Sequence, residues 1–319
     1  MFLTVCLNPT IQKTLRFPAV ISGTVNRTAL HRIDVSGKGI NVTRVLAQLG
    51  KKALHLTQLG GVMKPLFLSL CEKDGLSVEW AESNSEIRFC YTLLTDGAVT
   101  ELVEESQAVA AGTEDRLLEK YDALLNNLSS NLAPVIPGRA SDSLIISGTK
   151  AAGYSDAVIP SMAGKAKEKG LRIILDIKGK DLIECLKYEP DIVKPNLYEF
   201  AATFAPELIR DNEIALVDNK IKEQIKSIMT GIAEKHKCGI ILTNGREKIL
   251  AAIGNNFLEF EIPNVKTINS TGCGDAFTAG LAAALEDGAQ FEAAVTEGIR
   301  CGALNAGQEK PGCMAAGTA

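Results

Sequence analysis

Residues 269–288 read NSTGCGDAFTAGLAAALEDG: two glycines around a cysteine, then one acid, then an alanine-rich stretch with helical spacing. Glycine allows positive φ and lets the backbone approach a ligand closely. The first N–H groups of a helix have no partner within it, and the helix dipole adds to their attraction for an anion. Gly272, Cys273 and Gly274 therefore predict an anion site at the start of a helix.

Asp275 falls in the first turn of that helix, where the dipole favours the ionised carboxylate, so that it can accept a proton at neutral pH. An acid beside an anion site suits phosphoryl transfer to an alcohol, since the N–H groups hold the phosphoryl group and the acid takes the hydroxyl proton. An aspartate that caps a helix after a glycine turn gives the same pattern. These residues leave both interpretations open, although a cap alone does not need a glycine on each side of Cys273.

Two better-known phosphate motifs are absent from the sequence. A Walker A loop, GxxxxGK[ST], does not occur. GCGDAF lacks the third glycine of a Rossmann fingerprint and follows the last predicted strands instead of the first.

Outward from this stretch, the chain alternates short apolar runs with helical patterns, which indicates an α/β fold with a mostly parallel sheet and helices on both faces. The predicted strands cover residues 2–7, 53–61, 143–148, 171–177, 191–196 and 239–245. The predicted helices cover residues 37–50, 65–75, 154–169, 197–204 and 213–236.

Two segments, residues 11–35 and 86–105, break this alternation because they lack long helical patterns. In the second, IRFCYTLL and VTELVE flank TDGA, which is typical of a hairpin. We expect the two segments to form a small β-sheet lid inserted into an α/β core of residues 1–10, 36–85 and 106–319. The composition of residues 126–139, NNLSSNLAPVIPGR, predicts a loop or linker.

Composition narrows the classes of function. Acids (38) slightly outnumber bases (34), which argues against a general nucleic-acid binder. No apolar run approaches the ~18 residues of a membrane helix, and the N-terminal MFLTVCLNPT has the character of a buried strand and not of a signal peptide. Eight scattered cysteines without a CxxC pair favour a reduced, cytoplasmic protein, and with three histidines a zinc site is not expected.

Two further motifs carry polar side chains at predicted helix starts. In VSGKGINVTR, Gly37 and Lys38 precede Asn41 by about one turn, which suits a polyol or phosphate site but also an ordinary helix entry. In VKPNLYEF, Asn196 and Glu199 follow a strand, where they could hold Mg²⁺ through water or simply begin a helix.

In this order the motifs resemble those of the ribokinase-like PfkB carbohydrate kinases, most closely the branch of 1-phosphofructokinase and tagatose-6-phosphate kinase. The resemblance covers nearly the whole chain. It rests on TVCLNPT at the start, SGTVNRT, SGKGIN, IR at 87–88, SGT at 147–149, KPNLYE at 194–199 and STGCGD at 270–275.

The resemblance implies transfer of the γ-phosphoryl group of ATP, with Mg²⁺, to a sugar hydroxyl, most closely that of a phosphorylated ketohexose. It implies Asp275 as the catalytic base, residues 272–274 as the anion hole and Arg27 near the transferred phosphate. It assigns to the sugar phosphate Gln12, Gly37, Lys38, Asn41 and Arg88. It assigns to the nucleotide Lys194, Asn196, Thr243, Asn244, Gly245, Ser270 and Asn305, with Asn196 and Glu199 also near the metal. Family members often pair their lids, so we expect a homodimer through the lid.

The departures from the family pattern fall on the sugar side. NPTIQ carries Gln12 where the family has an acid, and Ser36 replaces a glycine. A kinase of an unphosphorylated sugar or nucleoside, or a catalytically silent sensor with the same fold, are the alternatives. Lys38 and Arg88 argue against a neutral acceptor, and Asp275 with its glycines argues against a silent protein.

Overall fold

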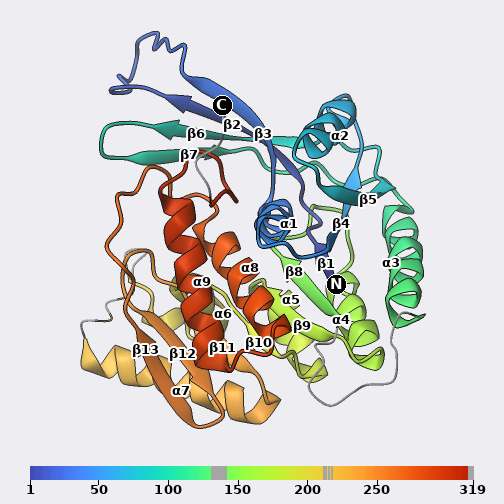
Figure 1. Ribbon diagram of the computed structural model, residues 1–319, viewed down its shortest axis with the longest axis vertical. Helices are drawn as coiled ribbons and strands as arrows, with labels where there is room; N and C mark the ends of the chain where they lie inside the picture. The colour runs from blue at the N-terminus through green and yellow to red at the C-terminus, as the bar shows by residue number, and fades with distance from the viewer. Residues whose placement is uncertain (131–141, 211–213, 215, 217, 315–319) are drawn as a thin grey trace.

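The computed structural model describes residues 1–130, 142–210, 214, 216 and 218–314. Its largest feature is a sheet of nine strands from these residues (Figure 1). In spatial order they are β13 (Asn256–Phe260), β12 (Ile249–Ile253), β11 (Gly239–Leu242), β10 (Ile192–Val193), β9 (Arg172–Asp176), β8 (Ser143–Ser147), β1 (Phe2–Val5), β4 (Ala53–Leu59) and β5 (Ser77–Glu82). The strands from β5 to β11 run parallel, and β12 and β13 add an antiparallel edge.

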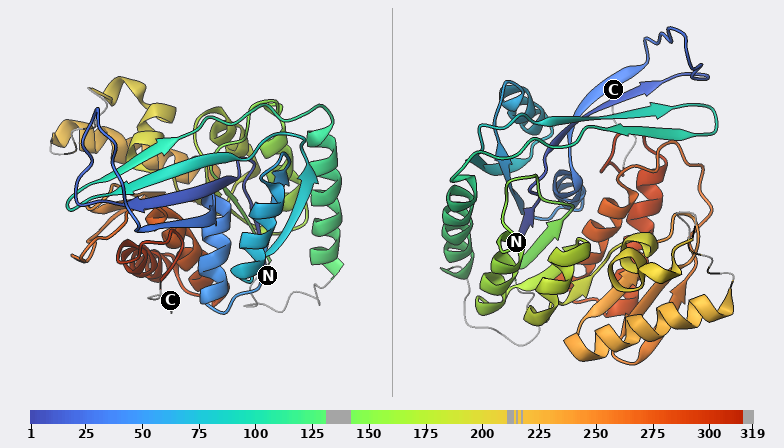
Figure 2. Two further views of the ribbon diagram at one scale, coloured as in Figure 1. Left: turned by 90° about the horizontal axis from the view of Figure 1, so that it is seen from above. Right: turned by 180° about the vertical axis from the view of Figure 1, so that it is seen from behind.

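Helices cover both faces of this sheet (Figure 2). One face packs against α3 (Thr113–Ser130), α4 (Val158–Glu168), α5 (Gly179–Cys185), α6 (Leu197–Phe204) and α7 (Asn219–His236). The other packs against α1 (Lys38–Gln48), α8 (Cys273–Glu286) and α9 (Phe291–Ala306). Neighbours along a strand alternate between the two cores, as Leu144 and Ile145 do, because successive side chains of a strand point to opposite faces. Two short 3₁₀ turns, Leu186–Tyr188 and Pro206–Leu208, follow α5 and α6.

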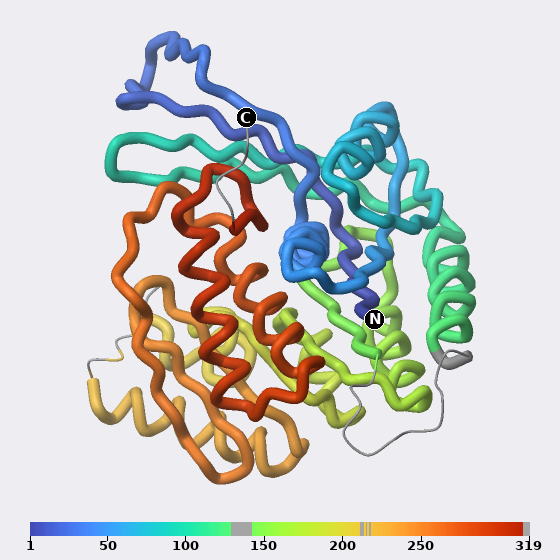
Figure 3. Tube along the Cα trace, viewed as in Figure 1, coloured from blue at the N-terminus to red at the C-terminus, as the bar shows by residue number. Residues whose placement is uncertain are grey.

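A smaller sheet stands over the carboxyl ends of the parallel strands. It contains β3 (His31–Ser36), β2 (Thr10–Arg16), β6 (Arg88–Leu94) and β7 (Val99–Val103), in that order. The pairs β3–β2 and β6–β7 are antiparallel, whereas β2 and β6 pair in parallel. The two arms, far apart in the sequence, lie side by side (Figure 3). The remaining helix, α2 (Lys64–Lys73), packs in a third apolar cluster with residues at the base of this sheet.

The fold class predicted from the sequence is confirmed, including the helices on both faces and the small separate sheet with its hairpin around residues 95–98. The predicted linker is wrong for residues 126–130, which belong to α3, and residues 131–139 lie outside the described residues. The helix predicted over 213–236 begins only at Asn219. The sequence patterns also missed α3, α5, α9, β5, β12 and β13. No helix among the described residues is long and apolar enough to cross a membrane.

Candidate active site

The glycine loop of residues 270–274 turns into α8 at Gly272, whose φ of 83° is left-handed. No side chain caps this helix, so the first-turn N–H groups of Gly274 and Asp275 have no acceptor within it. The N–H of Cys273 instead donates to the carbonyl of Ser270 at 3.2 Å. The Cys273 N–H thus closes the turn with a partner outside the helix, which leaves the N–H groups of Gly274 and Asp275 at the helix start.

Asp275 is buried in the first turn of α8, with 6% of its surface exposed. Its Oδ2 accepts a hydrogen bond of 2.7 Å from Nδ2 of Asn41 in α1. Burial raises the pKa of Asp275 to about 6; Lys38 and Lys194 oppose this rise and Asp176 adds to it. The sequence suggested that the helix dipole would favour ionisation, but removal of water has the larger effect. At neutral pH the group remains mostly ionised and close to its titration range, as a general base requires.

Beside Asp275, a buried carboxylate lies between two lysines. Asp176 ends β9, and its oxygens lie 3.1 Å from Nζ of Lys38 and 3.3 Å from Nζ of Lys194. Burial favours the neutral form of Asp176, but the two lysines outweigh it and hold its pKa below the ordinary value. Burial likewise disfavours charge on Lys38, and the carboxylates of Asp176, Glu199 and Asp275 reverse this and raise its pKa. Asp176 and Lys194 thus keep their charges although they are buried, and Lys38 lies partly exposed at the edge of the cluster.

Asn196 and Glu199 form a capping box at the start of α6. The Glu199 N–H donates to Oδ1 of Asn196 at 2.7 Å, and the Asn196 N–H donates to Oε2 of Glu199 at 3.0 Å. The other oxygen of Glu199 faces Nζ of Lys38 at 3.9 Å and Nζ of Lys178 at 3.7 Å. Because both side chains are engaged in the cap, the pair fits Mg²⁺ through its water shell better than by direct coordination. No cluster of His, Cys, Asp and Glu in the described ranges has the form of a dedicated metal site.

On one side of Asp275 lies a pocket of about 760 Å³. Predicted nucleotide residues Thr243, Gly245 and Ser270 line it, together with Cys273 and Gly274 from the glycine loop. Its apolar wall comes from Ile249, Ile262, Val265, Ile268, Phe277 and Ile299, and the β6–β7 turn closes one end with residues 95 and 97–99. A cavity with an apolar wall and an open helix N-terminus suits a nucleotide, because the wall can hold the nucleobase and the helix N-terminus the phosphates.

On the other side lies the inner face of the small sheet, which is polar yet buried. Thr10, Gln12 and Thr14 of β2 share this face with Ser36, Asp34, Cys90 and Thr92 by their pairing. Nε2 of Gln12 donates to Oγ1 of Thr92 at 2.6 Å. Arg88 starts β6 on the same face, and its Nε is buried without a hydrogen-bond partner. A guanidinium nitrogen without a partner is costly, although Nη1 of the same side chain donates to the Glu104 carbonyl at 3.2 Å.

The remaining predicted residues occupy different places. Gly37 is the N-cap of α1 with a φ of 107°. Lys194 is buried directly behind the helix start, since a Cβ on Gly274 would lie 3.7 Å from its Nζ. Asn305 is fully buried and holds the glycine loop to the C-terminal turn, donating to the Thr271 carbonyl and accepting from the Gly312 N–H.

Two predicted residues stand apart from this cluster. Arg27 lies exposed between β2 and β3, and within the described residues no hydrogen bond or ion pair joins it to the residues around Asp275. Asn244 follows Thr243 at the turn after β11, half-buried. The sequence patterns missed Asp176, although a single acid ending the apolar run LRIIL of residues 171–175 was a usable signal. They also missed Arg44 and Asp74, whose spacing carries no recognisable motif.

Polar groups gather at the carboxyl ends of the parallel strands, and one carboxyl group that titrates near neutral pH lies at an open helix N-terminus. This arrangement is typical of an α/β enzyme that transfers a group to a small molecule. The chain belongs to the pfkB family carbohydrate kinases, whose sequence pattern matches residues 6–315.

Proteins similar in sequence or in structure match this chain over almost their full length. The chain is 26% identical over 317 residues to a tagatose-6-phosphate kinase of Staphylococcus epidermidis, covering 98% of this chain and 94% of that protein. Phosphofructokinase-2 of Escherichia coli, solved with potassium, superposes with a TM-score of 0.79 at 20% identity, covering 97% and 93% of the two chains. A possible 1-phosphofructokinase of Thermotoga maritima gives a TM-score of 0.79 at 19% identity, covering 97% and 92%.

Proposed function

We propose that the protein transfers the γ-phosphoryl group of ATP, with Mg²⁺, to a hydroxyl of a sugar phosphate, in particular a phosphorylated ketohexose. The observation that carries the proposal is the position of Asp275. It stands buried at the uncapped start of α8, between the pocket under the β6–β7 turn and the polar inner face of the small sheet. One carboxylate there meets a hydroxyl from one side and a phosphate from the other.

Asp275 takes the proton of the attacking hydroxyl, since its pKa of about 6 matches a base working near neutrality. The N–H groups of Gly274 and Asp275 and the ammonium of Lys194 hold the transferred phosphoryl group in line. Asn41 keeps the carboxylate in place through its 2.7 Å hydrogen bond, and its second N–H serves a sugar hydroxyl. Arg27 joins the phosphate only if the loop between β2 and β3 moves inward.

The charge balance supports a divalent cation as partner of the nucleotide. Lys38, Lys178 and Lys194 are matched by Asp176, Glu199 and Asp275, so the cluster is neutral when all are charged. The charge of a triphosphate must then be met by an added cation. Asn196 and Glu199 would hold Mg²⁺ through its water shell, and the bound cation would supply that charge.

The acceptor is inferred from the cations on the sugar side and from the relatives. Arg88 offers a buried, unpartnered Nε, and Lys38 lies partly exposed at the edge of the site. Two cations favour an acceptor that already carries a phosphate. The names of the relatives, tagatose-6-phosphate kinase and phosphofructokinase, indicate the same chemistry. Gln12, bonded to Thr92, replaces a charged contact to the sugar hydroxyls by a neutral one.

We further propose that the small sheet acts as a lid over the acceptor and that two lids pair in a homodimer in the cytoplasm. Closure excludes water, which otherwise competes as the phosphoryl acceptor. Two contacts already seat the sheet on the core: Arg16 with Glu309 at 2.7 Å and Thr271 with Glu101 at 2.7 Å.

The test is ADP release from ATP and Mg²⁺ with tagatose 6-phosphate, fructose 1-phosphate, fructose 6-phosphate and their unphosphorylated sugars. We expect turnover with at least one phosphorylated ketohexose, and a fall in kcat of about 10²–10⁴-fold in Asp275→Asn. The matched control is Asp287→Asn, at the exposed far end of α8. Thermal stabilisation by ligands without ADP release would instead indicate a silent sensor, and equal rates with unphosphorylated sugars would reject the sugar-phosphate assignment.

A further inference from the structure

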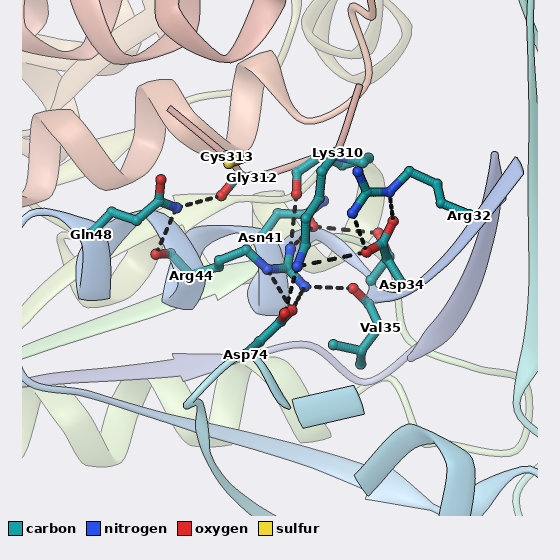
Figure 4. A network of polar contacts seen from close by, with 12 residues as sticks. Arg32, Asp34, Val35, Asn41, Arg44, Gln48, Asp74, Lys310, Gly312 and Cys313 are labelled. Carbon is teal, nitrogen blue, oxygen red and sulfur yellow. Dashed lines mark hydrogen bonds and ion pairs between the residues drawn. The ribbon is translucent and has the colours of Figure 1, made fainter. Parts of the chain in front are cut away.

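Behind Asn41 lies a buried polar network, drawn in Figure 4, that no motif predicted. Resting on the proposed role of Asp275 as base, we propose that Arg44, held by Asp74, is a positioning residue. It fixes the Asn41 side chain so that the amide nitrogen, and not the oxygen, meets the Asp275 carboxylate.

The contacts around Asn41 define its orientation. Nη1 of Arg44 donates to Oδ1 of Asn41 at 3.0 Å, one turn further along α1. The hydroxyl of Ser36 adds a weaker contact to the same oxygen at 3.4 Å. Nδ2 of Asn41 then points to Oδ2 of Asp275 at 2.7 Å. Asn41 has only 3% of its surface exposed, so water cannot easily replace either partner.

The reverse orientation of the amide is unfavourable at both ends. It would set the –NH₂ group against the N–H groups of Arg44, which has no acceptor to offer. It would also set the amide oxygen against the carboxylate of Asp275. Arg44 therefore does not touch the reacting atoms, but it selects the side-chain orientation that stabilises the ionised base.

Arg44 is itself immobilised. It is buried, with 5% of its surface exposed, and donates to the carbonyl of Val35 at 2.6 Å and the carbonyl of Pro311 at 2.9 Å. Its Nε and Nη2 lie 3.0 and 2.9 Å from Oδ2 of Asp74, the residue that ends α2. A planar guanidinium that serves acceptors in several directions cannot be replaced by a single ammonium.

The network extends from the core to the small sheet. Lys310 bridges Asp74 at 2.5 Å and Asp34 of β3 at 3.6 Å, and Arg32 pairs with Asp34 at 2.6 Å. Arg44, Asp74, Lys310 and Asp34 thus form a continuous line from Asn41 to the strand that covers the acceptor side. The same line anchors the segment 310–312 against α1, where a Cβ on Gly312 would lie 2.8 Å from Cα of Asn41.

A double-mutant cycle tests the proposal on the intact enzyme with ATP and the best acceptor. Asn41→Ala should lower kcat by about tenfold or more, the effect of losing a hydrogen bond to a charged group. Arg44→Lys, which keeps the charge next to Asp74, should lower kcat by a similar factor. In the Asn41→Ala background, Arg44→Lys should change kcat by less than about twofold, because the two residues act in series. If kcat of the double variant instead falls by the product of the two single-variant factors, the proposal is overturned.

The acid side of the pH profile of kcat/KM gives a second readout. Both single variants should shift this limb to higher pH, since the ionised form of Asp275 loses a donor. The other charged or titratable groups facing Asp275 are unchanged in them: Lys38, Lys194, Asp176, Cys6 and Cys273. The control is Arg116→Lys, an arginine of α3 that donates to the Glu82 carbonyl and to Thr113. It should leave the limb in place.

If Arg44→Lys fails to fold, as a melting curve will show, Asp74→Asn takes its place in the cycle with the same expectations and a smaller effect. An unshifted limb in a folded Arg44 or Asp74 variant would overturn the proposal. Failure of the proposed function is separate and visible beforehand, because wild-type protein would then release no ADP and Asp275→Asn would change nothing.

Discussion

Asp275 is a carboxyl group whose titration lies close to physiological pH. Burial raises its pKa to about 6, and a base must be deprotonated to work. We therefore expect kcat/KM to be constant well above pH 6 and to fall about tenfold per pH unit below pH 6. The measurement is a pH series with saturating ATP. If kcat/KM instead begins to fall only near pH 4, Asp275 is solvated or is not the base.

Asn41 and Arg44 show, also at the scale of the residue, that the contacts of a side chain depend on neighbours from other elements. The motif SGKGIN predicted a polar contact for Asn41, and the structure directs both ends of its amide to protein groups. A motif identifies a side chain by its local spacing. It cannot identify partners such as Asp275 or Arg44's anchor Asp74, which other elements bring into place.

At the scale of elements, the start of α8 contains two glycines, Gly272 and Gly274, that have different physical roles. Gly272 has a φ of 83°, and a Cβ there would lie 2.9 Å from the Gly312 nitrogen. Gly274 is helical, and the nearest atom to a Cβ there is Nζ of Lys194 at 3.7 Å. The backbone therefore requires glycine at position 272, whereas at position 274 a Cβ would meet only an ordinary contact with Lys194.

We expect Gly272→Ala to lower the free energy of unfolding by about 1–3 kcal/mol, because alanine is strained at this φ. Gly274→Ala should leave thermal stability unchanged or slightly higher, since alanine is the better helix former. It should nevertheless lower kcat by about tenfold or more, because the added methyl group displaces the phosphoryl group. Melting curves and ADP release measured on both variants separate the effects. Equal losses of stability would contradict the distinction.

Several elements were predictable from sequence because their signals are local. The alternation of apolar runs and helical patterns predicted the parallel strands other than β5, and KPNLYEF marked a capped helix start that Asn196 and Glu199 do form. The missed elements lack such signals. β12 and β13 form an antiparallel edge at one end of the sheet. α3 continues through residues 126–130 because its apolar face, which includes buried Leu128, packs on β5 and α4.

At the scale of the whole molecule, the active site joins distant parts of one chain. Asp34, Asp74 and Lys310 meet in one cluster, although they stand in the small sheet, after α2 and near the C-terminus. Sequence patterns cannot predict such a cluster, because nothing in the spacing of these three residues links them. The position of the small sheet and the orientation of the Asn41 side chain therefore depend on the same charged groups.

The small sheet also has an unusual division of faces, and this leads to a prediction about assembly. On β2, β3 and β6 the inner face is buried and mostly polar, while the outer face carries Leu102, 54% exposed, beside half-buried Tyr91. Ile33 and Phe89 of the outer face pack with the α2 cluster. Apolar surface in this position favours a partner, and a second copy placed across a two-fold axis would cover both outer faces. We therefore expect a dimer in solution.

Leu102→Lys should convert this dimer to a monomer, because a charge in an apolar contact is costly to bury. Sedimentation velocity at micromolar concentration measures the change. The matched control is Ile183→Lys, since Ile183 is 46% exposed on α5, away from the small sheet, and should leave the dimer intact. We expect the Leu102 variant also to raise the KM for the sugar phosphate, as an unpaired lid closes less readily, while the KM for ATP changes less. A wild-type monomer, or a Leu102→Lys dimer, would show that the outer face of the lid is not the interface.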